Sequence, residues 1–158
     1  MTDVIQKSYY CQNKQMKEFQ VKRDPQTTFW APVANVFFDI AHKVTDYIAR
    51  KEVLHEKSVS MDELSKASDP IIHHTFDTGE GILIPAEIIH YAKKGCKNFV
   101  ILQPFGCLPN HVIGRGVSKK LKEMFPDIDL LPLDYDPDVS FANLENRLQM
   151  MIMKQQPA

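Results

Sequence analysis

No apolar run in this chain of 158 residues approaches the roughly 20 residues that a helix needs to span a bilayer. Charge of one sign is equally missing, because 19 Lys and Arg against 20 Asp and Glu leave a formal net charge of −1. That balance gives no electrostatic reason to expect binding to nucleic acid or to an anionic membrane surface. Residues 1–7 contain no apolar segment of the kind found in secretory signals. We therefore expect a soluble cytoplasmic protein without nucleic-acid or membrane partners.

Cysteine is scarce, and its spacing matches no disulfide scaffold. The three cysteines, Cys11, Cys96 and Cys107, are an odd number, which is typical of proteins in a reducing compartment. A phosphate-binding P-loop is also missing, since Gly114 and Gly116 are not followed by the Lys-[Ser/Thr] ending of that motif. These glycines are therefore not a P-loop.

Length and composition are those of one compact globular unit, with 44% hydrophobic and 25% charged residues. The pattern along the chain nevertheless changes near residue 70. We expect a helical N-terminal segment over residues 1–70 and an α/β domain over residues 71–154.

The N-terminal segment is predicted to contain two helices. One spans about 32–55, with Pro32 in its first turn, and a second, short helix starts at Ser60, where Glu63 completes a capping box. Residues 1–30 fit either a short packed helix or a loosely held arm. The first of these helices has an apolar stripe at helical spacing, formed by Val33, Val36, Phe37, Ile40, Val44, Tyr47 and Ile48.

The C-terminal part alternates between predicted strands and helices. Strands are expected over 71–76, 98–102 and 129–133, and helices over 85–94, 111–125 and 141–153. Strands separated by single helices imply a parallel sheet with right-handed crossovers. The expected fold class is therefore α/β: a small parallel sheet with a Rossmann-like β-α-β-α-β-α C-terminal part, preceded by the helical segment. The last helix, with Ser140 as its N-cap, should bury Phe141, Leu144, Leu148, Met151 and Ile152.

Three loops should then leave the same edge of the sheet, at 77–81, 103–111 and 134–138. In open α/β sheets, ligands bind in the crevice outside the carboxyl ends of the strands. The side chains expected at this crevice, as ligand-binding or interface residues, are Glu80, Gln103, Asn110, His111, Arg115, Asp134 and Asp136.

Cys107 is the leading candidate in these loops. Its thiol could ligate iron or an iron–sulfur cluster, or act as a nucleophile activated by the helix that follows and paired with His111. It could also be a small buried hydrophobe. A position in a loop between Gly106 and Pro109, rather than on an apolar face, favours a functional role.

The other polar candidates have competing interpretations. Asp134 and Asp136, approached by Glu80, could do acid–base work or hold a hard cation, but Asp-Pro sequences also make turns, which we favour slightly. On the expected strand, His73 and His74 point to opposite faces and should not share one metal. Polar side chains of the last helix could brace the loop before it, namely Asn143, Asn146 and Arg147.

Together these residues resemble a known family. The pattern joins Gly79-Glu80-Gly81, the segment Gln-Pro-Phe-Gly-Cys-Leu-Pro-Asn-His at 103–111, Gly114-x-Gly116, and Asp-Tyr-Asp-Pro at 134–137 followed by Asn143, Asn146 and Arg147. It resembles the C-terminal region of the large CoA-substrate-specific enzyme activases, the ATP-dependent activators related to 2-hydroxyacyl-CoA dehydratases and benzoyl-CoA reductases. The resemblance covers about residues 77–153, and the Cys107 segment is its most specific part.

The resemblance implies anaerobic metabolism in which iron–sulfur clusters deliver low-potential electrons to a CoA thioester. Cys107 would then be a metal ligand, in a [4Fe–4S] cluster completed by other domains or chains. The actin-like ATPase module of such activases is missing here, neither Cys11 nor Cys96 sits in a family motif, and Asp138 stands where a glycine is expected.

The leading expectation is an accessory domain of a dehydratase-activating system, without independent turnover, whose partners are other domains or subunits of that system. Two alternatives remain open. The chain could be a non-catalytic interaction module with a structural Cys107, or a small cysteine-dependent enzyme that uses Cys107 and His111.

Overall fold

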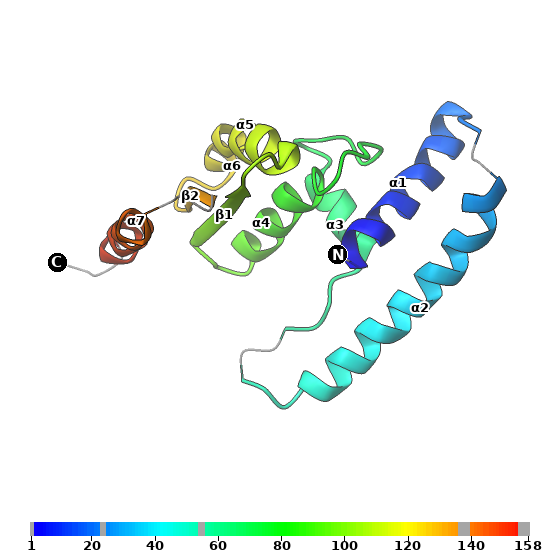
Figure 1. Cartoon of the computed structure of the whole chain (residues 1–158), viewed down its shortest axis with the longest axis horizontal. Helices are drawn as coiled ribbons and strands as arrows, with labels where there is room; N and C mark the ends of the chain where they lie inside the picture. The colour runs from blue at the N-terminus through cyan, green and yellow to red at the C-terminus, as the bar shows by residue number, and fades with distance from the viewer. Residues whose placement is uncertain (1, 23–24, 54–55, 136–139, 155–158) are drawn as a thin grey trace. The chain divides into compact units, whose positions relative to one another are not determined.

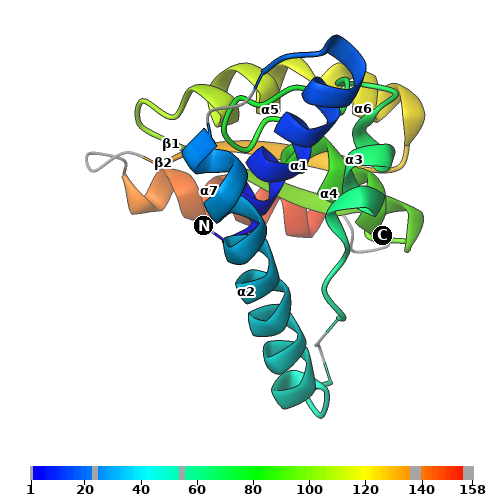
Figure 2. The same ribbon diagram turned by 90° about the vertical axis from the view of Figure 1, so that its right-hand side faces the viewer.

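The computed structural model describes residues 2–22, 25–53, 56–135 and 140–154. Figures 1 and 2 show a mixed α/β chain that is rich in helices and has a small parallel sheet. The chain divides into two compact units between Leu83 and Ile84, whereas the sequence pattern changes near residue 70. None of the described helices combines the length and the apolar character needed to cross a bilayer.

The first unit is helical, as the sequence predicts. It contains α1 (Thr2–Phe19), α2 (Pro25–Ala49) and α3 (Met61–Ser68), and α1 contacts both other helices. The first residues thus form a packed helix rather than a loose arm. The N-cap of α3 is confirmed, because the Ser60 hydroxyl accepts a hydrogen bond of 3.3 Å from the Glu63 amide.

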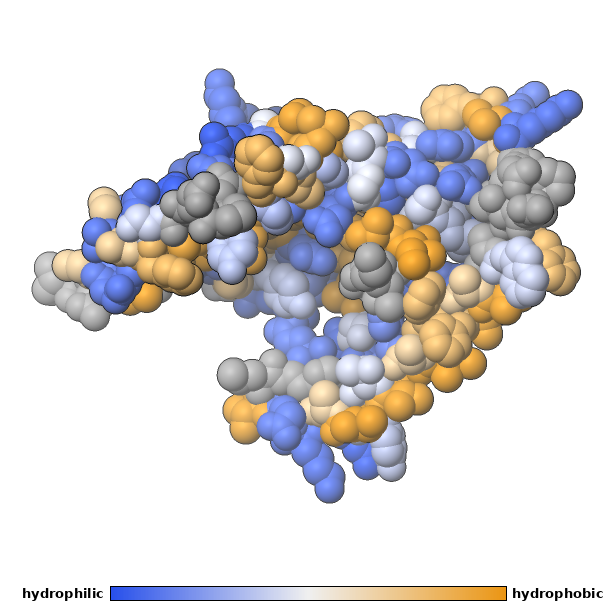
Figure 3. All heavy atoms as spheres, in the orientation of Figure 1, coloured by the Kyte–Doolittle hydropathy of each residue, from blue (hydrophilic) through white to orange (hydrophobic). Residues whose placement is uncertain are grey.

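Helix α2 begins seven residues before the predicted start. Pro32 therefore lies inside the helix, not in its first turn. The apolar stripe of α2 is exposed rather than buried in the first unit, and Figure 3 shows hydrophobic atoms gathered along this helix. The exposed fractions are 54% for Val33, 57% for Val36, 66% for Phe37, 55% for Ile40, 51% for Val44, 64% for Tyr47 and 72% for Ile48.

The predicted strand at 71–76 is wrong, because this segment consists of turns. Local hydrogen bonds use the backbone groups that a strand would offer to a neighbour. The amides of Ile71 and Ile72 donate to the Ser68 carbonyl at 2.8 and 2.9 Å. The amide of His74 donates to the Asp69 carboxylate at 2.9 Å. The loop at 77–81 therefore does not leave the end of a strand.

The second unit opens with α4 (Leu83–Lys93), close to the predicted helix at 85–94. Its C-terminal cap is also confirmed. Gly95 has a φ of +94°, a left-handed conformation that glycine adopts without steric cost. Its amide donates to Ala92 at 3.0 Å, and the Cys96 amide donates to Tyr91 at 3.0 Å.

Two predicted strands form the sheet. β1 (Asn98–Pro104) and β2 (Asp129–Tyr135) pair in parallel, with the register running from Asn98 opposite Asp129 to Pro104 opposite Tyr135. The α/β class and the parallel sheet are confirmed. The sheet described has two strands, because the third predicted one is a set of turns.

The connection between the strands is an interrupted helix. It consists of the π-helical turn η1 (Pro109–Ile113), α5 (Gly114–Gly116) and α6 (Ser118–Met124), where one continuous helix is predicted. Gly114 explains how this helix approaches β1, since a Cβ added there would lie 2.9 Å from Cγ2 of Ile101. The absence of that side chain allows the close packing.

The last helix, α7 (Phe141–Met153), has the predicted bounds and packs beside β2 (Figure 2). Its predicted burial is confirmed in part. Met151 is buried and Leu144 and Leu148 are partly buried. Phe141 is 81% exposed and Ile152 is 61% exposed, because the two-stranded sheet offers the helix a narrow surface. Nη2 of Arg147 donates to the Pro132 carbonyl at 2.6 Å, so this arginine braces β2.

Candidate functional site

A polar network at the carboxyl ends of the two strands joins four of the predicted site residues. Gln103, near the end of β1, is fully buried. Its Nε2 donates to the Asn110 carbonyl at 2.7 Å, and its Oε1 accepts from Nε of Arg115 at 2.8 Å. Nη2 of Arg115 reaches Oδ1 of Asp134 at 2.6 Å. Four segments of the second unit are therefore connected: β1, η1, α5 and β2.

This network positions the loop that follows β1, and its ion pair contributes little to the stability of the fold. The Arg115–Asp134 ion pair is about half exposed, and such pairs contribute on the order of 0–1 kcal/mol. The buried amide of Gln103 matters more, because an unpaired buried polar group costs about 1–3 kcal/mol. Gln103 satisfies two partners from one buried side chain and so fixes where η1 begins relative to β1.

Cys107 lies between a turn and the start of η1. Its amide donates to the Pro104 carbonyl at 3.0 Å, and its carbonyl accepts from the His111 amide at 3.1 Å. Gly106 precedes it with a φ of +73°, which suits the third position of a type II turn. The side chain of Cys107 is half-buried. Both backbone groups of Cys107 are thus anchored while its thiol stays partly accessible.

His111 does not form the predicted dyad among the described contacts. The backbone amide of His111 donates to the Cys107 carbonyl. The ring nitrogen Nδ1 of His111 is buried and has no hydrogen-bond partner among the described residues. A cysteine nucleophile needs a base in contact with its sulfur. The arrangement therefore gives no support to a Cys107–His111 enzyme.

The predicted carboxylates are not assembled into a pair. Asp134 is engaged by Arg115, and Asp136 lies outside the described residues. Glu80 is exposed in a turn of the first unit, where its carbonyl accepts from the Leu83 amide at 2.9 Å. Its place at a shared crevice stays a prediction.

Cys96 and Cys107, the two cysteines of the second unit, do not share a metal site. Cys96 precedes β1 and Cys107 follows it, so a strand of seven residues, about 20 Å at the rise of a strand, separates them. Cys11 belongs to the first unit and is fully buried, with its sulfur 3.2 Å from the His74 carbonyl. Burial raises the pKa of the Cys11 thiol to about 11.

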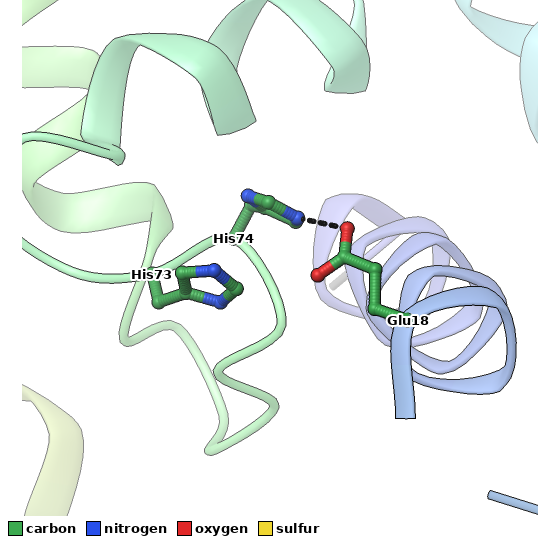
Figure 4. A group of neighbouring side chains, drawn as sticks. All are labelled: Glu18, His73 and His74. Atoms are coloured by element: carbon green, nitrogen blue, oxygen red, sulfur yellow. Dashed lines mark hydrogen bonds and ion pairs between the residues drawn. The ribbon is translucent and has the colours of Figure 1, made fainter. Parts of the chain in front are cut away.

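The first unit holds a side-chain cluster that the sequence analysis missed. Glu18, His73 and His74 each offer a ligand atom, and these atoms lie within 4.8 Å of one another (Figure 4). The expectation that His73 and His74 point apart is wrong, because their rings stack with centroids 4.2 Å apart. The Asp69-Pro70 pair, a turn signal directly before the histidines, could have indicated this.

His74 is the centre of that cluster. Its Nε2 lies 2.6 Å from Oε1 of Glu18, and its Nδ1 lies 2.7 Å from Oδ1 of Asp69. The hydrogen bond to Glu18, followed by that to Asp69, raises the pKa of His74 above its ordinary value.

Comparison of the chain with protein-family models, with curated proteins and with solved structures found no match.

Proposed function

We propose that this chain is an accessory α/β domain of a 2-hydroxyacyl-CoA dehydratase-activating system. It presents Cys107 to another domain or subunit, where the thiol completes an iron–sulfur cluster or a protein interface. The observation that supports the proposal is the structure of the Cys107 loop. Its backbone is anchored, Cys107 is only partly buried, and its apolar neighbours are exposed.

The anchoring supports a role that needs a fixed thiol position. Gln103 holds the Asn110 carbonyl in η1, and the Cys107 backbone bonds to Pro104 and His111. A cluster ligand or an interface residue benefits from such preorganisation, because little conformational freedom is lost when the partner binds.

The apolar surroundings support a protein partner. Phe105 is 82% exposed, Leu108 is 61% exposed and Val112 is 59% exposed. A protein partner that covers this loop would remove these three apolar side chains from water, which favours association. We call these three residues the Cys107 surface.

Cys107 fits one position of a cluster and not a complete site. A [4Fe–4S] cluster is held by four thiolates as a rule, and the described residues bring no second cysteine to this loop. The remaining ligands would come from the partner. When bound, such a cluster supplies low-potential electron transfer, and a partner could also complete a Rossmann-like sheet around β1 and β2.

Anaerobic reconstitution tests the proposal. The full chain is incubated with Fe²⁺ and sulfide, alone and mixed with the products of the genes encoded beside it. We expect a brown chromophore in the mixture that is lost in Cys107→Ser and retained in Cys96→Ser, the matched control. Equal chromophores in both variants would contradict a ligand role for Cys107.

The second candidate function is a pure interaction module with a structural Cys107, which the exposed Cys107 surface also favours. Pull-down of the same gene products separates the two. Binding that survives Cys107→Ser, needs no iron and is lost in Phe105→Ser would assign the loop to docking alone.

A further inference from the structure

We propose that Glu18, His73 and His74 bind a divalent cation of the zinc class in the first unit. Asp69 acts there as the outer partner that orients His74. None of these residues belongs to the Cys107 loop, so the inference goes beyond the proposed function and does not depend on it.

The donor set is the first argument. Two imidazoles and one carboxylate form a ligand combination that zinc uses when it keeps a further position for water. One ligand atom from each side chain lies within 4.8 Å of the other two. Zinc bonds of about 2.0–2.1 Å in tetrahedral geometry place ligand atoms about 3.3 Å apart. Rotation of the side chains, above all that of His73, would bring the three ligand atoms from within 4.8 Å to this spacing; Figure 4 shows the three side chains.

The position of Asp69 is the second argument. Metal-bound histidines almost always donate their other ring N–H to a carboxylate, a carbonyl or water. His74 has this arrangement already, with Nδ1 2.7 Å from Oδ1 of Asp69. The same carboxylate oxygen accepts the backbone amide of His74 at 2.9 Å. The ring is thus oriented with Nε2 toward Glu18.

His73 is also held by local contacts. Its Nδ1 accepts the Thr75 backbone amide at 3.4 Å and lies 2.8 Å from the Thr75 hydroxyl, so a metal would bind Nε2, with the ring proton moving to Nδ1 and donating to that hydroxyl. Its ring stacks on that of His74 at an interplanar angle of 28°. The two imidazoles come from consecutive residues, and because their lone pairs lie in the ring planes, one ring would turn out of the stack to bind the same ion.

In the short contact between His74 and Glu18, a metal ion would take the place of a proton. Nε2 and Oε1 are 2.6 Å apart, so one proton between them makes a short hydrogen bond. A divalent cation in place of that proton would hold the same groups and draw in His73. Glu18 and His73 are exposed and His74 is partly so, so an ion can enter from solvent.

Cobalt and zinc titrations of the untagged full chain test the site. We expect Co²⁺ to give the visible absorption of a four-coordinate nitrogen–oxygen site, without the near-ultraviolet band of a thiolate ligand. Zn²⁺ should displace it and raise the unfolding temperature. Glu18→Gln, His73→Gln and His74→Gln should each weaken Zn²⁺ binding by about 100-fold or more, and Asp69→Asn by about 10- to 100-fold.

His42→Gln, on α2 of the same unit, is the matched control and should leave Zn²⁺ affinity unchanged. The far-ultraviolet circular dichroism of each variant confirms that it is folded. Zn²⁺ binding that persists in the three ligand variants, or no binding by the folded wild-type chain, would overturn the proposal and leave a proton-bridged ion pair.

A further measurement distinguishes failure of this inference from failure of the proposed function. Cys107→Ser should retain the cobalt spectrum of the wild-type chain. If the wild-type chain gives the cobalt spectrum but forms no iron–sulfur chromophore on reconstitution, only the proposed function is lost. A thiolate band that disappears in Cys107→Ser would instead move the metal to the cysteine and end the proposal.

Discussion

Gln103 occupies a fully buried position and bonds to both Asn110 and Arg115. An amide in that position serves as donor and acceptor at once, which no apolar residue of the same size can do. The strand end, the Cys107 loop and the interrupted helix therefore depend on one side chain.

Replacement of Gln103 by Leu should lower the free energy of unfolding by about 1–3 kcal/mol, because the Asn110 carbonyl and Nε of Arg115 lose their partner. Urea denaturation measures the change. Gln149→Leu on the exposed surface of α7 is the control and should stay within about 0.5 kcal/mol of the parent. Equal effects of the two substitutions would argue against the network.

The buried thiol of Cys11 should make the stability of the protein depend on pH. Burial raises the pKa of its thiol from 9.0 to about 11, so the unfolded chain releases this proton first. The unfolded state then binds fewer protons than the folded state, and stability falls as the pH rises from about 9 to about 11. Denaturation at several pH values should show a steeper decline for the parent than for Cys11→Ala. Parallel declines would mean that Cys11 does not contribute.

At the scale of elements, local signals predicted what local forces determine. Helix α3 follows from its Ser60 cap, α4 from its Gly95 ending, and β1 and β2 from short apolar runs. The segment at 71–76 was mispredicted because Asp69 binds the backbone of His74, a side-chain bond that competes with strand pairing.

The candidate sites divide in the same way. Gln103, Arg115 and Asp134 could be expected together, because parallel strands end at one edge. The particular hydrogen bonds that join them could not be predicted, since these depend on the π-helical turn η1. The cluster of Glu18 and His74 joins residues 56 positions apart, and only the packed first unit brings them together.

The close approach of Gly114 to β1 leaves no room for a larger side chain. Gly114→Ala places a Cβ 2.9 Å from Cγ2 of Ile101, and relief of that contact should cost about 1–3 kcal/mol. Gly116→Ala, where nothing lies within 4 Å, should be neutral or slightly stabilising because alanine favours helix. Thermal unfolding of both variants measures the difference, and similar unfolding temperatures would contradict the close packing against β1.

At the scale of the whole molecule, exposed apolar surface is the dominant feature. It includes the stripe of α2 and the Cys107 surface, each on its own unit. Apolar side chains left in water favour association with a partner that buries them.

The α2 stripe should bind a hydrophobic dye such as ANS. Phe37 and Ile40 are 66% and 55% exposed, so the double variant Phe37→Gln and Ile40→Gln should reduce the fluorescence of the bound dye. Lys43→Gln, a polar change on the same helix, is the control and should not. Equal fluorescence in all three proteins would mean that the stripe is covered in solution.

The parallel pairing of β1 with β2 also has a consequence for synthesis on the ribosome. Asn98 pairs with Asp129, so each residue of β1 emerges 31 positions ahead of its mate. At about 5–20 residues per second, β1 waits roughly 2–6 s before pairing can begin. Ile101, which is buried in the folded unit, stays uncovered during that interval, which makes early engagement by a chaperone advantageous for this protein.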